Sequence, residues 1–236
     1  MNSDFWRLRE NVRYLSILTL VVLCALNPNT MTFAFLIFWI LMIMILGNVR
    51  RLSSNNKVAY FFRMTLYFLP YTLPFALFVR NDALFNINSI LFLYCSFAIM
   101  LFLIWLRINW KFIKLSLSDE IIVGISKESK YTLYLRMYTT VGAAICEELF
   151  FRGFILSIDA PIYFTLPVSV FFFMLSHYML PWGEVSFTRR DHLYQITFGL
   201  VSGVLFLLSG SIIPSILYSN NIKTVTQGIV EIAIFW

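Results

Sequence analysis

Apolar positions along the chain gather into eight runs that are bounded by polar residues, prolines or glycines. Backbone polar groups at membrane depth must be satisfied inside the segment, so each run is expected to form a helix. An upright span needs about 20 residues, and the shorter runs are therefore expected to be tilted, broken or packed inside the bundle. The pattern predicts an all-α polytopic membrane protein with about eight transmembrane helices. The runs are residues 12–26, 31–48, 58–79, 88–108, 137–157, 162–180, 192–208 and 211–224.

Composition supports this interpretation. Of the 236 residues, 60% are hydrophobic and only 13% are charged. A soluble domain of this length could not bury so much apolar surface, which makes the chain an integral membrane protein in contact with the lipid bilayer. Three cysteines, Cys24, Cys95 and Cys146, lie within apolar runs without metal-ligand spacing and are expected to be packing residues.

Basic residues are distributed unevenly among the loops and predict the orientation of the chain. They precede the first run and occupy loops 49–57, 109–136 and 181–191, whereas the alternate loops contain only Arg80. The positive-inside rule assigns the basic loops, and with them both termini, to the cytoplasm. Because these residues lie beside the spans, topology explains them better than nucleic-acid binding, and no nucleic acid is expected as a partner.

The chain divides into parts of different character. Residues 1–108 form the N-terminal transmembrane helices, and 109–136 read as a cytoplasmic interfacial amphipathic segment of one or two helices, with Ser118-Asp119-Glu120 typical of a helix start. Residues 137–224 form a C-terminal four-helix core, and 225–236 form a tail. No repeat relates the two halves, which counts against an inverted-repeat transporter.

Three ionisable groups, Glu147, Glu148 and Arg152, lie within the fifth apolar run. Each charge at membrane depth costs at least about 2.5–3.5 kcal/mol, so three together need a reason. On an α-helix Glu148 and Arg152 are four residues apart, the geometry of an ion pair, and Glu147 lies about 100° around the helix. One carboxylate would then be held by arginine and the other free for chemistry. The alternative is a charge pair that only joins helices.

His177 lies near the cytoplasmic end of the sixth run, with Phe173 one turn before it on the same face. The short connection around Asp159 makes the fifth and sixth runs antiparallel neighbours, so Glu147 and His177 differ in depth by only ~6 Å. A buried carboxylate can take a proton from water, and an imidazole can orient that water or stabilise an oxyanion. If Glu147 is instead paired with arginine, Glu148 faces His177 and the two roles are exchanged.

The last two runs contain small and polar residues. Gly199 and Gly203 form a small-xxx-small pattern that favours close helix packing. Ser209-Gly210-Ser211 then breaks the chain before a short helix that begins near Pro214. Its polar end would be costly in a membrane unless it lines a cavity or forms hydrogen bonds across the bundle. These polar residues are Tyr218, Ser219, Asn220 and Asn221.

Order and spacing of these motifs resemble the CPBP family, which contains the CAAX prenyl endopeptidases and the bacterial Abi proteins of bacteriocin processing and immunity. The resemblance covers residues 137–224. It rests on Glu147-Glu148-x-x-x-Arg152, on Phe173-x-x-x-His177, on Phe198-Gly199 and on the stretch from Gly210 to Ile216.

This resemblance implies a metal-independent glutamate protease in a bacterial cell membrane, acting without a cofactor. Glu147 would activate water, Glu148 and Arg152 would support it with Phe173, and His177 would position the water. The substrate would be a peptide or protein entering from the cytoplasmic side. A zinc site built from these groups and His192 is not expected, because no ligand pair has zinc-site spacing.

The chain departs from the family at its last core helix, where members have a second histidine followed by Asn or Asp. Counting five residues from Pro214 reaches Ser219, and four more reach Lys223. Hydrogen bonds to an oxyanion would then come from Tyr218, Ser219, Asn220 or Asn221. The alternative function is a protease-like membrane protein without efficient hydrolysis, acting in bacteriocin self-immunity or as a regulatory partner of another membrane protein.

Overall fold

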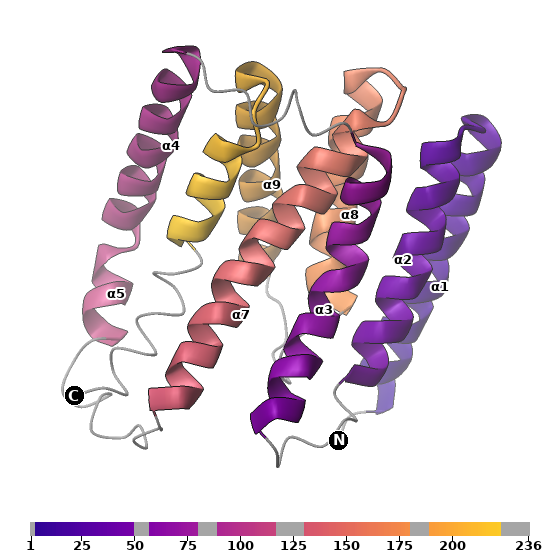
Figure 1. Ribbon diagram of the computed structural model, residues 1–236, viewed down its shortest axis with the longest axis horizontal. Helices are drawn as coiled ribbons and strands as arrows, with labels where there is room; N and C mark the ends of the chain where they lie inside the picture. Colours follow the sequence, from indigo (N-terminus) through magenta and orange to yellow (C-terminus); the bar gives the residue numbers. More distant parts are fainter. Residues whose placement is uncertain (1–2, 50–56, 80–88, 117–129, 180–188, 223–236) are drawn as a thin grey trace. The chain divides into compact units, whose positions relative to one another are not determined.

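The computed structural model describes residues 3–49, 57–79, 89–116, 130–179 and 189–222 (Figure 1). Over these ranges the chain is mainly helical and contains no strand, which confirms the all-α class, and each predicted apolar run overlaps a described helix. The elements are α1 (Ser3–Leu26), α2 (Thr30–Val49), α3 (Lys57–Phe78), α4 (Ser89–Ile108), α5 (Trp110–Ser116), α7 (Lys130–Glu148), the π-helix η1 (Leu149–Phe154), the 3-10 helix η2 (Ile155–Ser157), α8 (Ile162–Met179) and α9 (Arg189–Ser209). A last helix covers residues 213–222.

Three stretches in the described part are long and apolar enough to cross a membrane: Ile90–Ile108, Ile162–Met179 and Asp191–Ser209. A fourth apolar helix, Thr30–Ile45, is shorter. These helices identify a membrane protein. Eight spans, cytoplasmic termini and a bacterial membrane stay predictions.

The chain forms two compact units. The first comprises Met1–Asp82 and Leu149–Val204, and the second comprises Ala83–Glu148 and Leu205–Trp236. Each unit therefore joins stretches that are distant in the sequence. The predicted division at residues 108, 136 and 224 stays a prediction, and Ser118-Asp119-Glu120 and the 225–236 tail lie outside the described residues.

In the first unit, α1, α2 and α3 lie side by side in that order, α1 also packs on α8, and η1 packs on α3 and α8 (Figure 1). Aromatic rings fill the space between these helices. Trp39 of α2 is fully buried, 4.7 Å from the Phe172 ring of α8 in edge-to-face geometry. Phe150 of η1 contacts Phe35 and Tyr71 in the same way. This aromatic core fixes η1 and α8, which carry several of the predicted site residues.

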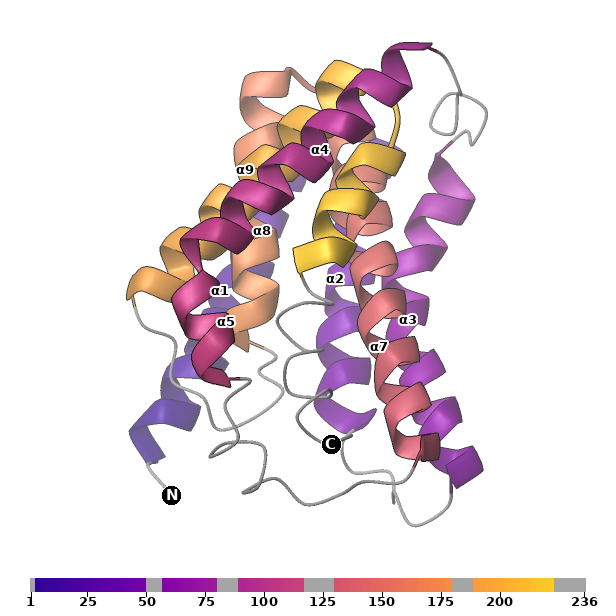
Figure 2. The same ribbon diagram turned by 90° about the vertical axis from the view of Figure 1, so that its left-hand side faces the viewer.

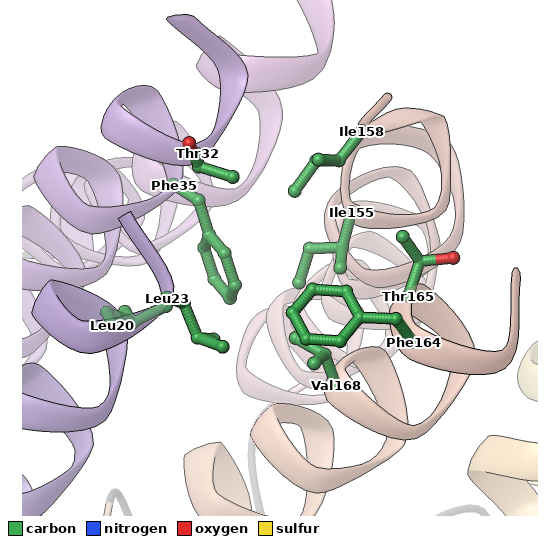
Figure 3. Close-up of a pocket in the computed structure, with 9 residues that line it drawn as sticks. All are labelled: Leu20, Leu23, Thr32, Phe35, Ile155, Ile158, Phe164, Thr165 and Val168. Carbon is green, nitrogen blue, oxygen red and sulfur yellow. The ribbon is translucent and has the colours of Figure 1, made fainter. Parts of the chain in front are cut away.

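A small apolar cavity lies in the first unit between α1, α2, η2 and α8 (Figure 3). Thr165 of α8 lines it and is 1% exposed. The Thr165 oxygen points away from the cavity and has no hydrogen-bond partner among the described residues. The complete lining is Leu20, Leu23, Thr32, Phe35, Ile155, Ile158, Phe164, Thr165 and Val168.

In the second unit, α4 and α5 follow each other with a turn at Asn109 (Figure 2). The Asn109 side chain donates a hydrogen bond to the Trp105 carbonyl, 2.9 Å away, which stabilises the turn. The short helix α5 agrees with the helix expected in 109–136. However, α7 begins at Lys130 rather than at 137, because residues 130–136 are polar enough to fall outside the apolar run yet contain no helix breaker.

The break predicted at Ser209-Gly210-Ser211 is present. Gly210 has φ +61°, the left-handed conformation that commonly ends a helix and that glycine adopts without strain. The Ser209 hydroxyl accepts a hydrogen bond from the Ser211 amide at 3.1 Å. Ser211 in turn accepts one from the Ile213 amide at 3.4 Å, which places a serine before the first turn of the last helix.

Candidate active site

The chain is π-helical immediately after Glu148, over Leu149–Phe154. A π-helix has i→i+5 hydrogen bonds, so the regular α-helical spacing expected between Glu148 and Arg152 does not hold across this stretch. Sequence periodicity missed the change because the extra residue in the turn leaves no compositional signature. π turns are uncommon and occur frequently at functional sites, and here the aromatic packing around Phe150 and Phe151 offsets the cost of the wide turn.

Arg152, on the π turn, is fully buried. Its guanidinium carbon lies 4.6 Å from the centroid of the Phe173 ring, and one terminal nitrogen donates a hydrogen bond to the Gly199 carbonyl at 3.3 Å. A desolvated cation–π contact is worth about 2 kcal/mol or more. Arg152 therefore joins η1, α8 and α9 inside the first unit.

Phe173 and His177 share one face of α8, as the sequence predicted, and their ring centroids are 4.5 Å apart. The half-buried His177 ring places Nδ1 3.0 Å from the Phe173 carbonyl. A carbonyl only accepts hydrogen bonds, so this contact favours the Nδ1–H tautomer, in which Nε2 of a neutral imidazole is the acceptor; the Ser176 hydroxyl, 3.3 Å from Nδ1, can donate to the other tautomer. An acceptor nitrogen suits the orientation of a water molecule better than the stabilisation of an oxyanion, which needs a donor.

Phe198 and Gly199 complete this cluster from α9. The Phe198 ring stacks on Phe173 with a centroid distance of 5.6 Å. A Cβ atom at Gly199 would lie 3.3 Å from Val170, and one at Gly203 would lie 2.5 Å from Leu166. The two glycines therefore allow α9 to approach α8 closely, as the small-xxx-small pattern predicted.

Sequence reasoning missed Ser169, which is buried on α8. Its hydroxyl donates a 2.7 Å hydrogen bond to the Phe151 carbonyl on the π turn. Ser169, Phe173 and His177 are spaced by four residues, so they share one face of α8. A polar residue at this spacing in an apolar run was the signal that could have found it.

The second unit contains the two carboxylates, at the end of α7. Glu147 is 4% exposed and Glu148 is completely buried. Tyr218, on the last helix, is also buried and interacts electrostatically with Glu148. The Tyr218 phenol is therefore close enough to Glu148 to feel its charge.

The other polar residues of the last helix lie beside Tyr218 in the sequence. Ser219 is completely buried, and its hydroxyl has no hydrogen-bond partner in the described part of the chain. Asn220 and Asn221 are half-buried. That Ser219 takes the place of the family's second histidine stays a prediction.

Glu147 and Glu148 belong to the second unit, whereas Arg152 and His177 belong to the first. How the two carboxylates lie relative to Arg152 and His177 therefore stays a prediction. The other histidine, His192, lies in the first unit with its ring centroid 5.9 Å from that of Tyr178. Within the described ranges, no cluster of three or more His, Cys, Asp or Glu side chains could hold a metal ion.

Comparison with known proteins places a family match on this region. The comparisons with curated proteins and with solved structures gave no match. Residues 129–218 match the family model of the type II CAAX prenyl endopeptidase Rce1-like proteins. The segment that contains the glutamate pair, Arg152, Phe173 and His177 is therefore similar to CAAX prenyl endopeptidases, which supports its resemblance to the CPBP family.

Proposed function

We propose that this protein is an intramembrane endopeptidase of the CAAX protease type, which hydrolyses a peptide bond with a glutamate-activated water. The observation that carries the proposal is the contact of buried Arg152 and Phe173 with half-buried His177 inside the matched segment. A buried arginine held against the ring next to a half-buried histidine is costly in a membrane protein and is typical of a functional site. The Rce1-like match gives the class of reaction.

In the proposed reaction Glu147 takes a proton from a water molecule whose orientation is set by Nε2 of His177. The water oxygen attacks the peptide carbonyl carbon and gives a tetrahedral oxyanion. Collapse of this intermediate breaks the C–N bond, and Glu147 returns its proton to the leaving amine. Glu148 and Arg152 support the base, and the Tyr218 hydroxyl donates a hydrogen bond to the oxyanion. Ser219, Asn220 and Asn221 supply further polar groups beside Tyr218 on the last helix.

The substrate class follows from the surroundings of the site. A peptide bond reached from the cytoplasmic side of an apolar bundle belongs to a peptide or protein held at the bilayer. The purified protein in lipid vesicles should therefore be given two fluorogenic CAAX peptides that are identical except for a farnesyl group on the cysteine. Cleavage of the farnesylated peptide alone indicates a prenyl-dependent substrate, and cleavage of both indicates a general membrane endopeptidase.

The test of the mechanism uses Glu147→Gln, which keeps the size of the side chain and removes the base. We expect the folded variant to lose cleavage by roughly 100-fold or more, within the range of general-base catalysis. His192→Gln is the matched control for His177→Gln. His192 lies beside Tyr178, and the His192→Gln protein should keep the wild-type rate. A Glu147→Gln protein with the wild-type rate would refute the proposal.

The alternative proposal is a protease-like protein that acts in bacteriocin self-immunity or regulates another membrane protein. The observation that favours it is the complete burial of Ser219, which the sequence count places at the second family histidine. A serine hydroxyl is a weaker hydrogen-bond donor than an imidazole, and the serine side chain reaches less far from the backbone. Full bacteriocin protection by Glu147→Gln, together with no peptide cleavage by the wild-type protein, would establish this alternative.

A further inference from the structure

The Arg13 side chain of α1 contacts the C-terminal end of α8, the helix that carries His177. One of its terminal guanidinium nitrogens donates a hydrogen bond to the Met179 carbonyl at 3.3 Å. Met179 is the last residue of α8 and is completely buried. The described part of α8 ends at Met179, and Arg13 gives its carbonyl a hydrogen-bond donor from another helix. Its positive charge also suits the negative end of the helix dipole.

A buried hydrogen-bond network holds the backbone of α1 at Arg13. The Ser16 hydroxyl donates to the Arg13 carbonyl at 2.7 Å, and the indole nitrogen of Trp39 donates to Ser16 Oγ at 2.9 Å. Ser16 Oγ also lies 3.8 Å from the Met179 sulfur. Both Ser16 and Trp39 are buried, and the Trp39 ring packs on Phe172 of α8. Residues from α1 and α2 therefore contact α8 both at its last residue and beside Phe173.

The last turn of α8 determines the hydrogen bonding of His177. The side chain of His177 reaches the Phe173 carbonyl only while this turn stays helical, since the two residues are one turn apart. Helix ends fray when their terminal carbonyls lack partners. Fraying from Met179 would reach His177 within two residues and would release Nδ1 from the carbonyl.

We infer that Arg13 is a positioning residue for His177: by holding the Met179 carbonyl, it keeps the last turn of α8 helical and His177 in the Nδ1–H form. Residues outside the matched segment 129–218 then contribute to the site. The consequence for catalysis rests on the proposed function, whereas the consequence for the imidazole does not depend on it.

The test measures the imidazole itself. The chain contains only two histidines, so ¹⁵N-histidine spectra of the full protein in lipid nanodiscs show two rings, which His192→Gln assigns. At pH about 8 an ordinary histidine is neutral, and the nitrogen shifts report its tautomer. We expect His177 to be predominantly the Nδ1–H form in the wild type. In Arg13→Gln this form should become the minority, with the His192 signals unchanged.

Further variants separate positioning from general loss of structure. Ser16→Ala and Trp39→Phe should shift the His177 tautomer in the same direction, which keeps the test available if Arg13→Gln does not fold. Thr19→Ala is the matched control, since Thr19 is half-buried on α1 and its hydroxyl donates a hydrogen bond to the Leu15 carbonyl of its own helix. Arg107→Gln removes one charge at an exposed position and controls for net charge. Neither control should change the His177 signals.

Activity provides a second measurement. Arg13→Gln should reduce kcat for the CAAX peptide about tenfold and leave KM within about twofold, as expected for a misplaced catalytic group. If the wild type cleaves no peptide, the proposed function fails while the tautomer measurement still tests the role of Arg13. Unchanged His177 signals in folded Arg13→Gln would overturn the inference, whatever the activity.

Discussion

The guanidinium of Arg152 lies on the face of the Phe173 ring, 4.6 Å from its centroid, with both side chains almost completely inaccessible. One aromatic side chain thus supports the buried cation and the His177 ring, which belong to different helices. A motif phenylalanine that looks like ordinary packing in the sequence has an electrostatic role in the structure.

Phe173→Leu tests this role, because leucine keeps the apolar contact and removes the aromatic face. We expect it to lower the free energy of unfolding by about 2 kcal/mol, the worth of a desolvated cation–π contact. Thermal melting of the purified protein in detergent measures the change. Phe171→Leu is the control, since Phe171 is 42% exposed on the same helix. Equal melting shifts in the two variants would contradict the role of the ring.

Glu147→Gln and Glu148→Gln should affect different properties, one peptide cleavage and the other folding. If the predicted pair of Glu148 with Arg152 forms, Glu148→Gln should reduce the yield of folded protein, since breaking a buried ion pair from one side costs about 3–5 kcal/mol. Glu147→Gln should fold normally and lose peptide cleavage. Size-exclusion yield and cleavage rate, measured on both proteins, separate the two roles. The reverse pattern would show that Glu147 is the carboxylate paired with Arg152.

Gly203→Ala should destabilise the contact between α8 and α9. The new methyl group would lie 2.5 Å from a Leu166 methyl, so the leucine side chain must move, at a cost of about 1 kcal/mol. Combining it with Leu166→Val should recover more stability than the sum of the single variants predicts. Additive melting shifts in this double-mutant cycle would show that the two residues do not share this contact.

Thr165→Val should stabilise the protein or leave it unchanged. The Thr165 hydroxyl is buried without a hydrogen-bond partner among the residues that the structure describes, and valine has nearly the same shape. An unsatisfied buried hydroxyl costs about 1–3 kcal/mol, so its removal should raise the melting temperature. A lower melting temperature would contradict the account of Thr165 as an unsatisfied buried hydroxyl.

Cysteine labelling tests the topology. With Ser126 replaced by cysteine, in a background without the native cysteines, a membrane-impermeant maleimide should react only after the cell membrane is opened. Ser126 lies outside the described residues, and its cytoplasmic location follows from the basic loops alone. Labelling in intact cells would reverse the predicted orientation of both termini.

The sequence predicted the features that depend on local pattern. The helices were predicted from continuous runs of apolar residues, and the shared face of Phe173 and His177 from their spacing. The break at Gly210 was predicted from the conformational freedom of glycine. Contacts between distant segments carry no such signal. The hydrogen bond from Arg13 to Met179 joins residues 166 positions apart, and only the fold brings them together.

The π turn at Leu149–Phe154 escaped prediction for another reason. Its residues are those of an ordinary apolar helix, and its stability comes from rings on other helices, such as Tyr71 on Phe150. The role of Ser169 escaped prediction for the same reason, because its hydrogen bond depends on the position of the Phe151 carbonyl on that turn.

The π turn also divides one continuous helical run into two parts whose side chains follow different phases of the helical repeat. A turn with one additional residue delays the rotation of the chain by one position, about 100° of an α-helix. Positions tolerant of polar substitution should therefore repeat with a 3.6-residue period through α7, then jump in phase across Leu149–Phe154. Deleting a single residue of that turn would remove the jump together with the wide turn and leave the later side chains of the run on their present faces, so a one-residue deletion there should be tolerated better than one in the middle of α7.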